Sequence, residues 1–478
     1  MAETESCCLL TKKLWIGERK FMEKRKHERS TFSGKLGFVL SAAGASVGLG
    51  NIWRFPYLAA KYGGGIFLLV YIILAMTFGY TMIMAETALG RMTKKSPVGA
   101  FGKFGKSGWL SFGGWINAII PVLIVPYYSV IGGWVIKYLV EYIKGNSAGL
   151  ATDGYFSEFI SGGVSTEVCF IAFSLITLLI IYAGVQNGVE RVSKFMMPVL
   201  VVLSVVIVVY SVTRPGAMEG VKYFLVPNPA NFSWMTVVAA MGQMFYSLSI
   251  AMGILVTFGS YMKKDVSIEG STTNVEIFDT AIAMMAGLMI IPAVFAFSGG
   301  DPDTLQAGPS LMFITIPKVF ASMGMGTFVG IMFFLLVLCA ALTSSIALTE
   351  SAVSTFQDEM KWSRKKATVI VGIIMIILGS LSSLGYGPLA FVKIIGMQFL
   401  DFFDFLTNSV MMPIAAIATC LLVSRVIGVQ KIEEEVTLEG GNFRRKNIFN
   451  FMINYLCPIF AAIILFSSVA NAFGWISM

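Results

Sequence analysis

Charged residues are scarce in this sequence of 478 residues, and histidine is almost absent. Lysine, arginine, aspartate and glutamate together make up 13% of the chain, whereas soluble domains average about 25%. The single histidine, His27, lies in a basic stretch near the start. Residues 44–48 match the G-x-S-x-G pattern of hydrolases, but the segment is helical in character and has no histidine to pair with its serine. The lone histidine also excludes two-histidine zinc motifs.

Cysteine is present but not in any pattern that binds a metal. The six cysteines form no C-x-x-C motif and have no metal-ligand spacing; they are Cys7, Cys8, Cys169, Cys339, Cys420 and Cys457. Most lie in apolar stretches, which favours buried or free thiols. Acylation of Cys7 and Cys8 close to a membrane is an open alternative.

Apolar residues are abundant instead. They make up 56% of the chain, and the mean hydropathy is +0.77. Apolar stretches of 18 or more residues predict membrane-spanning helices, so we expect an all-α polytopic membrane protein. Eleven spans are predicted, at residues 36–60, 65–90, 110–144, 166–184, 192–213, 233–260, 275–298, 324–357, 367–384, 390–425 and 447–474.

The basic residues fall mainly on one side of this arrangement. If the N-terminus is inside, 27 of the 35 lysines and arginines lie in the tail 1–35 and the other inner connections. The positive-inside bias therefore places the N-terminus in the cytoplasm. Eleven crossings then place the C-terminus outside a plasma (inner) membrane. The net charge of +8 belongs to these inner segments and requires no nucleic-acid partner.

The first span carries residues that a simple lipid-spanning helix would avoid. Gly44, Gly48 and Gly50 are followed by Asn51 and Arg54. Each glycine costs up to about 1 kcal/mol of helix stability relative to alanine. Backbone groups freed by a break need partners, because hydrocarbon offers none. The pattern indicates a helix interrupted at mid-membrane next to a cavity, although small residues also allow close helix packing.

The sixth span shows the same features, with Ser247 and Ser249 at mid-depth and then Gly253 and Gly259. One broken helix thus opens each of two five-helix sets, 36–213 and 233–425, and the odd number of crossings inverts the second set. Paired interrupted helices indicate a transporter site near the midplane. The eleventh span, 447–474, stands outside the repeat.

Several motifs then reveal a family likeness. They are AAGASVGLGNIWRFPYLAAKYGGGIF (42–67), ETALGR (86–91), PYYSVIGGW (126–134), GQMFYSLSIAMG (242–253), ALTSSIALTES (341–351), QDEMKWSRKKA (357–367) and LDFFDFLTN (400–408). The chain resembles the neurotransmitter:sodium symporters, and most of all their eleven-helix bacterial branch. The resemblance implies sodium-coupled symport of hydrophobic or aromatic L-amino acids by alternating access, with two Na⁺ ions and no organic cofactor.

The resemblance also implies the sodium ligands. The second site would use the carbonyls of Gly44, Val47 and Ala340 with the hydroxyls of Thr343 and Ser344. The first would use the Ser46 carbonyl, Asn51, Ser247 and the substrate carboxylate. Sodium is a hard cation, and unwound carbonyls and Ser, Thr or Asn side chains supply its oxygen ligands. Alternatively, the hydroxyls of Thr343 and Ser344 bond back to their own helix or to a neighbour.

Asp279 is a carboxylate inside the seventh span, eight residues before Gly287. An ionisable group within a membrane helix is a functional candidate by default. By resemblance it occupies the position of a sodium-ligating asparagine. We expect it to supply a fixed negative charge that makes transport independent of chloride. The alternative is a carboxylate that extends to the inner connection.

The resemblance also implies a substrate site with no charged side chain. Its residues would be Ala45, Ser46, Gly48, Leu49, Gly50, Ile124, Tyr128, Tyr246, Ser247, Ser249, Met252, Ser344 and Leu348. Tyr128 would donate to the carboxylate, and Ser249 and nearby carbonyls would accept from the ammonium group. Charged side chains should be rejected, whereas flexible Met252 favours a broad apolar pocket. Ala251 stands where a glycine would allow more unwinding, which disfavours acceptance of tryptophan.

Two charged pairs are candidate gates. Arg54 and Asp404 resemble the family's extracellular pair, and Arg29 and Asp358, with Tyr261 nearby, resemble the cytoplasmic pair. Incidental pairing at helix ends, worth about 0–1 kcal/mol, is the alternative. Other functions also remain open: the same fold could carry an amine or osmolyte, and an ion channel is a rival from another class. The sequence leaves the oligomeric state open.

Overall fold

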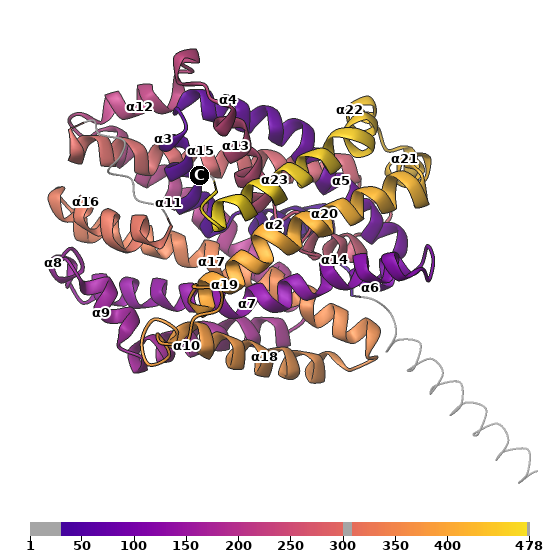
Figure 1. Ribbon diagram of the computed structural model, residues 1–478, viewed down its shortest axis with the longest axis horizontal. Coiled ribbons are helices and arrows are strands. Elements are labelled where there is room, and N and C mark those ends of the chain that lie inside the picture. Colours follow the sequence, from indigo (N-terminus) through magenta and orange to yellow (C-terminus); the bar gives the residue numbers. More distant parts are fainter. Residues whose placement is uncertain (1–29, 300–307, 476–478) are drawn as a thin grey trace, which may run out of the picture.

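The computed structural model describes residues 30–299 and 308–475, and it is a bundle of helices (Figure 1). In this part of the chain, nine helical spans are long and apolar enough to cross a membrane. They are Gly65–Thr93 (α4 to α5), Gly108–Ile143 (α7), Val164–Tyr182 (α10), Val185–Val212 (ending in α11), Ile268–Ser298 (α15), Gly326–Glu359 (α17), Arg364–Leu384 (α18), Phe399–Ile427 (α19 and α20) and Lys446–Ala472 (α22 and α23).

The first span is broken where the glycines are. Helix α2 (Lys35–Ser46) ends within the glycine-rich stretch, and a π-helical turn, Gly50–Arg54, leads into α3 (Phe55–Lys61). The two halves are bent by 53°. The residue after α2, Val47, is extended, so the chain leaves helical geometry within the glycine-rich stretch. The predicted interruption of this span is confirmed.

The sixth span is interrupted as well. Helix α13 (Trp234–Ser247) begins at a capping box formed by Ser233 and Thr236, and α14 (Ile254–Tyr261) resumes after six residues. Within this break Ser249 and Ala251 have φ angles of 53° and 59°. Side chains other than glycine pay about 1–2 kcal/mol for such left-handed geometry, so surrounding contacts must hold the break in place. In the described part of the chain, length and composition give nine candidate spans, or ten if the bent pair α2–α3 is counted as one span; α13 and α14 correspond to the predicted sixth span.

The start of the tenth span corrects the prediction. The sequence predicted helix from residue 390, whereas the helix begins at Phe399. Before it, Ile395 and Gly396 have positive φ angles of 52° and 79°. The backbones of Ile394 and Met397 exchange two hydrogen bonds, of 2.9 and 3.0 Å. This tight turn satisfies locally the backbone groups that a helix would have paired.

Shorter helices connect the spans. They are α6 (Pro97–Gly102), α8 (Ser147–Leu150), α9 (Tyr155–Ser161), α12 (Ala217–Leu225), α16 (Ile316–Ser322) and α21 (Val429–Val436). The long helices α7 and α17 pack along each other in the middle of the bundle, and α2 lies against both α15 and α17 (Figure 1). The breaks of the first and sixth spans therefore lie inside the protein, shielded from lipid.

Glycines set the distance between α5 (Tyr80–Thr93) and α14. A Cβ added at Gly90 would lie 2.0 Å from the carbonyl oxygen of Val256, and one added at Gly259 would lie 2.4 Å from that of Thr87. Both contacts are with backbone atoms, which cannot move aside without shifting a helix. The second half of the sixth span is thus held against α5 at a separation that only glycine permits.

We expect Gly90→Ala to lower the free energy of unfolding by about 1–3 kcal/mol, the usual range for overpacking. Gly102→Ala is the matched control, because a Cβ at Gly102 meets nothing within 4 Å. Thermal unfolding of both variants in detergent measures the difference. Equal melting temperatures for the two variants would show that α5 and α14 can move apart to accommodate the added methyl group without loss of stability.

Candidate functional site

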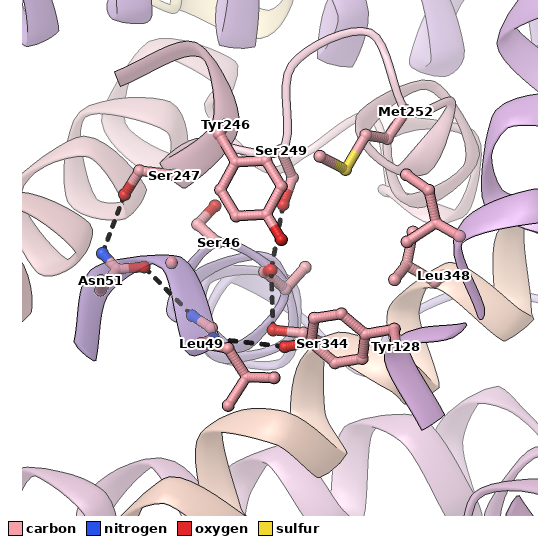
Figure 2. Close-up of a pocket in the computed structure, with 14 residues that line it drawn as sticks. Ser46, Leu49, Asn51, Tyr128, Tyr246, Ser247, Ser249, Met252, Ser344 and Leu348 are labelled. Carbon is pink, nitrogen blue, oxygen red and sulfur yellow. Dashed lines mark hydrogen bonds between the residues drawn. The ribbon is translucent and has the colours of Figure 1, made fainter. Parts of the chain in front are cut away.

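The two breaks meet around a cavity of about 30 Å³ (Figure 2). Fourteen residues line it: Ala45, Ser46, Gly48, Leu49, Gly50, Asn51, Ile124, Tyr128, Tyr246, Ser247, Ser249, Met252, Ser344 and Leu348. All thirteen residues of the expected substrate site are among them, joined by Asn51, which was expected as an ion ligand. Residues from four separate spans are therefore brought together by the fold.

The amide groups freed by the first break point to this cavity. The Gly48 N–H donates to Asn51 Oδ1 at 3.2 Å, and the Leu49 N–H donates to the Tyr128 hydroxyl at 3.3 Å (Figure 2). A Cβ at Gly48 would lie 2.8 Å from Ser344 Oγ and 3.1 Å from the Tyr128 hydroxyl, so a larger residue would fill the space. Backbone N–H groups and a hydroxyl converging at a helix start suit a carboxylate.

Carbonyl groups from the same break gather around the Ser344 hydroxyl. Ser344 Oγ lies 3.3, 3.1 and 3.3 Å from the carbonyl oxygens of Gly44, Ala45 and Val47. Ser249 Oγ also donates to the Ala45 oxygen, at 3.0 Å. A hydroxyl expected to face an ammonium group is thus already bonded to the first span.

Thr343 shares the neighbourhood but bonds within its own helix. Its Oγ1 donates to the carbonyls of Cys339 and Ala340 at 3.0 and 3.1 Å. A Cβ placed on Gly44 would be 3.1 Å from Thr343 Cβ, so the two chains touch. The five residues expected at the second sodium site are therefore neighbours in space, and Thr343 makes the back-bond that was the alternative interpretation.

A second polar cluster surrounds Asp279 in α15. Asn51 Nδ2 donates to Asp279 Oδ1 at 2.9 Å and to Ser247 Oγ at 2.8 Å, and Ser247 Oγ lies 3.0 Å from Asp279 Oδ2. Tyr71 donates its hydroxyl to Asp279 Oδ2 at 3.2 Å. Asp279 is fully buried, so it does not extend to the inner connection, and its carboxylate faces the residues expected at the first sodium site.

Two participants were not identified from the sequence. Tyr71, a partner of Asp279, is one of several aromatic residues in an apolar run, and nothing in its spacing distinguishes it. Glu86 is fully buried in α5, and its Oε1 accepts the Ala251 N–H of the second break at 2.8 Å. The rule that singled out Asp279, an ionisable group within a span, would also have found Glu86.

The two ends of the cavity differ in character. Asn51 and Ser247 lie at one end, whereas Met252 and Leu348 lie together at the other (Figure 2). Ile124 adds a further apolar side chain to the lining, and none of the fourteen lining residues has a charged side chain. A ligand with a polar head and an apolar side chain therefore fits the chemistry of this lining.

A larger cavity of about 370 Å³ lies next to it, and Tyr246 lines both. Arg54 and Asp404 face this larger cavity. The Arg54 guanidinium lies 5.5 Å from the centre of the Tyr246 ring, and Asp404 Oδ1 accepts from Asn408 Nδ2 at 2.6 Å. Among the described residues Arg54 and Asp404 form no ion pair within 4.0 Å, so they flank the cavity as expected but do not close it.

Near the N-terminal end of the described chain, aromatic side chains pack closely against one another. The Phe32 ring makes edge contacts with Phe38, Phe258 and Tyr261, at centroid distances of 5.5 to 6.0 Å. Tyr261 also donates its hydroxyl to Glu350 at 2.8 Å. Ser96 donates its N–H to Asp358 at 2.6 Å, and Arg29, the expected partner of Asp358, lies outside the described residues.

The donor set fits a hard monovalent cation. Carbonyls, hydroxyls, an amide and one carboxylate converge on the two polar clusters. No group of three or more His, Cys, Asp or Glu side chains that would hold a metal occurs in the described ranges. Oxygen donors with a single negative charge match Na⁺ better than a divalent or transition metal.

Comparison with known proteins agrees with this chemistry. The model of the sodium:neurotransmitter symporter family matches residues 29–150 and 157–474. The chain belongs to the sodium:neurotransmitter symporter family. Members of this family are transporters and not enzymes, so the chain is a sodium-dependent symporter that crosses the membrane many times.

Individual proteins similar to this symporter include sodium-dependent transporters and a solved structure. The sodium-dependent transporter YhdH of Bacillus subtilis is 35% identical over 91% of this chain and 96% of its own length. The sodium- and chloride-dependent GABA transporter 2 of rat is 28% identical over 86% of this chain and 75% of its own. The crystal structure of MhsT in complex with L-phenylalanine matches with a TM-score of 0.82 and 35% identity, covering 92% of this chain and 100% of that one.

Proposed function

We propose that this symporter carries hydrophobic and aromatic L-amino acids into the cell together with two Na⁺ ions. The observation that supports the proposal most is the cavity between the two helix breaks, which has N–H and hydroxyl groups near one end and Met252 and Leu348 at the other. L-Phenylalanine bound to MhsT, a similar structure, supports the same class of substrate.

In this proposal the Leu49 N–H and the Tyr128 hydroxyl bind the substrate carboxylate, so the hydrogen bond between them (3.3 Å) opens toward the ligand. Carbonyls near Ser46, Tyr246 and Ser247 accept from the ammonium group. The Ser249 hydroxyl turns from the Ala45 carbonyl to do the same. A cavity of about 30 Å³ holds little more than a water molecule, so Met252 must move to admit a large side chain.

Sodium would bind at the two oxygen clusters. The first holds the Ser46 carbonyl, Asn51, Ser247 and Asp279, and the second holds the carbonyls of Gly44, Val47 and Ala340 with Thr343 and Ser344. The positive charge of the ion compensates the buried carboxylate of Asp279. Substrate and ion thus share the first broken helix, which couples their binding.

Access would alternate between the two sides of Tyr246. The larger cavity with Arg54 and Asp404 leads to the outside, and the ring cluster of Phe32, Tyr261 and their neighbours closes the cytoplasmic side. This orientation places the N-terminus in the cytoplasm, as the basic residues favour. Release inside requires the ring cluster to separate.

The test is uptake of labelled leucine or tryptophan into proteoliposomes of the purified protein. A sodium gradient should drive saturable uptake and counterflow, and competition by a panel of solutes should rank apolar amino acids first. Competition by amines or betaines alone would favour the rival solute class. Sodium-dependent flux without counterflow would indicate a channel.

Chloride should not be required. Asp279 already supplies a fixed negative charge beside the first ion cluster, whereas the GABA transporter relatives are chloride-dependent by name. We expect initial uptake rates in sodium gluconate to be within about twofold of those in sodium chloride. Loss of uptake in gluconate would contradict the role given to Asp279.

Ala251 should limit the size of the substrate. It holds a left-handed conformation (φ 59°) that glycine adopts with no penalty, a difference of about 1–2 kcal/mol. Ala251→Gly should therefore unwind the break further and improve tryptophan affinity relative to leucine by roughly fivefold or more. Ala240→Gly, within the regular helix α13, should leave this ratio unchanged, and competition assays measure both.

A further inference from the structure

Arg364 joins the adjacent ends of α10 and α18. Its guanidinium donates to the Ile181 carbonyl oxygen, at 2.9 Å from Nε and 2.7 Å from Nη2, and to Glu350 Oε1 at 3.0 Å from Nη1. The two helices pack along each other (Figure 1), and a Cβ added at Gly372 would lie 3.0 Å from Leu178 Cδ1. Glu350 therefore balances the charge of Arg364, whose side chain fixes the last turn of α10 beside the first turn of α18.

The next two residues, Lys365 and Lys366, are exposed, and no carboxylate of the described ranges lies within 4.0 Å of their ammonium groups. Lys365 Nζ lies 5.5 Å from the centre of the Tyr182 ring, and Lys366 Nζ lies 4.5 Å from that of Trp362. Trp362 in turn stacks on Phe356, with ring centres 5.6 Å apart. An aromatic ring attracts a cation but carries no net charge, so both lysines are held in place with their charge unbalanced. The positive end of the α18 dipole adds to this potential.

Two exposed apolar stripes begin at the same point. On α18 the residues four apart that follow Lys365 are 50% to 58% exposed: Val369, Ile373 and Ile377. On α10 the stripe that leads away from Tyr182 is 52% to 69% exposed: Leu179, Leu175 and Val168. Side chains three or four residues apart share one face of a helix. Because Lys365 contacts the Tyr182 ring, the two stripes start side by side and together form one lipid-facing surface.

We propose that Lys365 and Lys366, positioned by the rings of Tyr182 and Trp362, bind the headgroup of one anionic phospholipid whose acyl chains lie along the two stripes. Unbalanced cations at the membrane surface favour a negative headgroup over a zwitterionic one, and tyrosine and tryptophan suit the depth of the headgroups. In the orientation proposed above, this lipid belongs to the cytoplasmic leaflet. Its binding requires neither that orientation nor a transported substrate, so it can be tested apart from the proposed function.

Other basic residues at the inner connections are in a different situation. Several have carboxylate partners at 2.7 to 2.9 Å: Arg445 with Glu276, Lys446 with Glu433, and Lys194 with Glu190. Lys95 and Lys106, on the connection that leads to α7, are exposed, but no ring of the described ranges lies beneath their ammonium groups. These two lysines therefore carry the same charge as Lys365 and Lys366 without the aromatic support, which makes them a matched control.

Native mass spectrometry of the purified protein in detergent measures binding, with phosphatidylglycerol and phosphatidylcholine of identical acyl chains supplied together. We expect one phosphatidylglycerol per chain to be retained in preference to phosphatidylcholine. The double variant Lys365→Gln with Lys366→Gln should bind phosphatidylglycerol roughly 25-fold more weakly, since each lysine near a membrane surface contributes about fivefold. Its affinity for phosphatidylcholine should not change. Tyr182→Leu should weaken phosphatidylglycerol binding about two- to fivefold, the usual contribution of an exposed cation–π contact.

The control Lys95→Gln with Lys106→Gln changes the net charge equally and should bind phosphatidylglycerol like the parent. Thermal unfolding verifies that each variant is folded. Glycerol 3-phosphate, a headgroup without acyl chains, should not displace the lipid even in excess. The proposal is overturned if the parent does not prefer phosphatidylglycerol, if both double variants lose it equally, or if the Lys365 and Lys366 variant retains it fully. Displacement by glycerol 3-phosphate would also overturn it, because the site would then bind a soluble phosphate.

Discussion

Replacing Asp279 by asparagine should lower sodium affinity at least a hundredfold and abolish sodium-driven uptake at ordinary sodium concentrations in chloride-free buffer. A unit charge about 4 Å from a cation contributes about 4 kcal/mol at an effective dielectric constant near 20. Asparagine keeps the shape and one oxygen, and can still accept from Asn51 and Ser247, which now bond the carboxylate at 2.9–3.1 Å. The variant therefore removes the charge with little change in packing.

The measurement is sodium-dependent thermal stabilisation, followed by uptake over a sodium titration. Asp153→Asn is the control, since Asp153 is an exposed carboxylate paired with Lys318 on a connection. It should behave like the parent. Parental sodium affinity in Asp279→Asn would show that no ion binds at this cluster, and would remove the basis for chloride independence as well.

Replacing Tyr128 by phenylalanine should raise the Kd for the amino acid by roughly 10- to 150-fold while leaving sodium binding in place. A hydrogen bond to a charged group contributes about 1.5–3 kcal/mol, which corresponds to this change in affinity. The loss should be similar for every amino acid substrate, because the hydroxyl is proposed to bind the carboxylate that all of them share.

Tyr127→Phe is the control for this experiment. Tyr127 is the next residue in α7 and is also buried, but its hydroxyl pairs with Thr407 at 3.2 Å and accepts from Asn408, not from the first span. Isothermal titration in saturating sodium compares the two variants. An equal affinity loss in both would assign the effect to helix packing, and an unchanged Kd in Tyr128→Phe would exclude the proposed carboxylate contact.

The sequence alone indicated the number of spans and the two interruptions. Length and hydropathy predict a membrane helix because the hydrocarbon core of a bilayer has a characteristic thickness and offers no hydrogen-bond partners. Gly44, Gly48 and Gly50 stand out against that background. The start of the tenth span was wrong because apolar residues fill the turn before Phe399 as well, and hydropathy does not distinguish a turn from a helix.

The individual site contacts were harder to foresee. Tyr71 reaches Asp279 from a span that carries many aromatic residues, and Glu86 reaches the Ala251 amide across the bundle. The sequence predicted Arg54 and Asp404 as a gate, but the distance between them depends on how the first and tenth spans are packed relative to each other. Such contacts join residues that are far apart in the chain, and no local pattern records the distance between them.

By itself, then, the sequence determined the membrane class, the many apolar helices and the two places where helix formation fails, since these depend on local composition and on the solvent around each segment. Only the tertiary structure decided that both breaks meet at one cavity and that Asp279 faces Asn51 and Ser247. The reason is physical: a helix break needs partners for its free N–H and C=O groups, and packing alone chooses which side chains supply them.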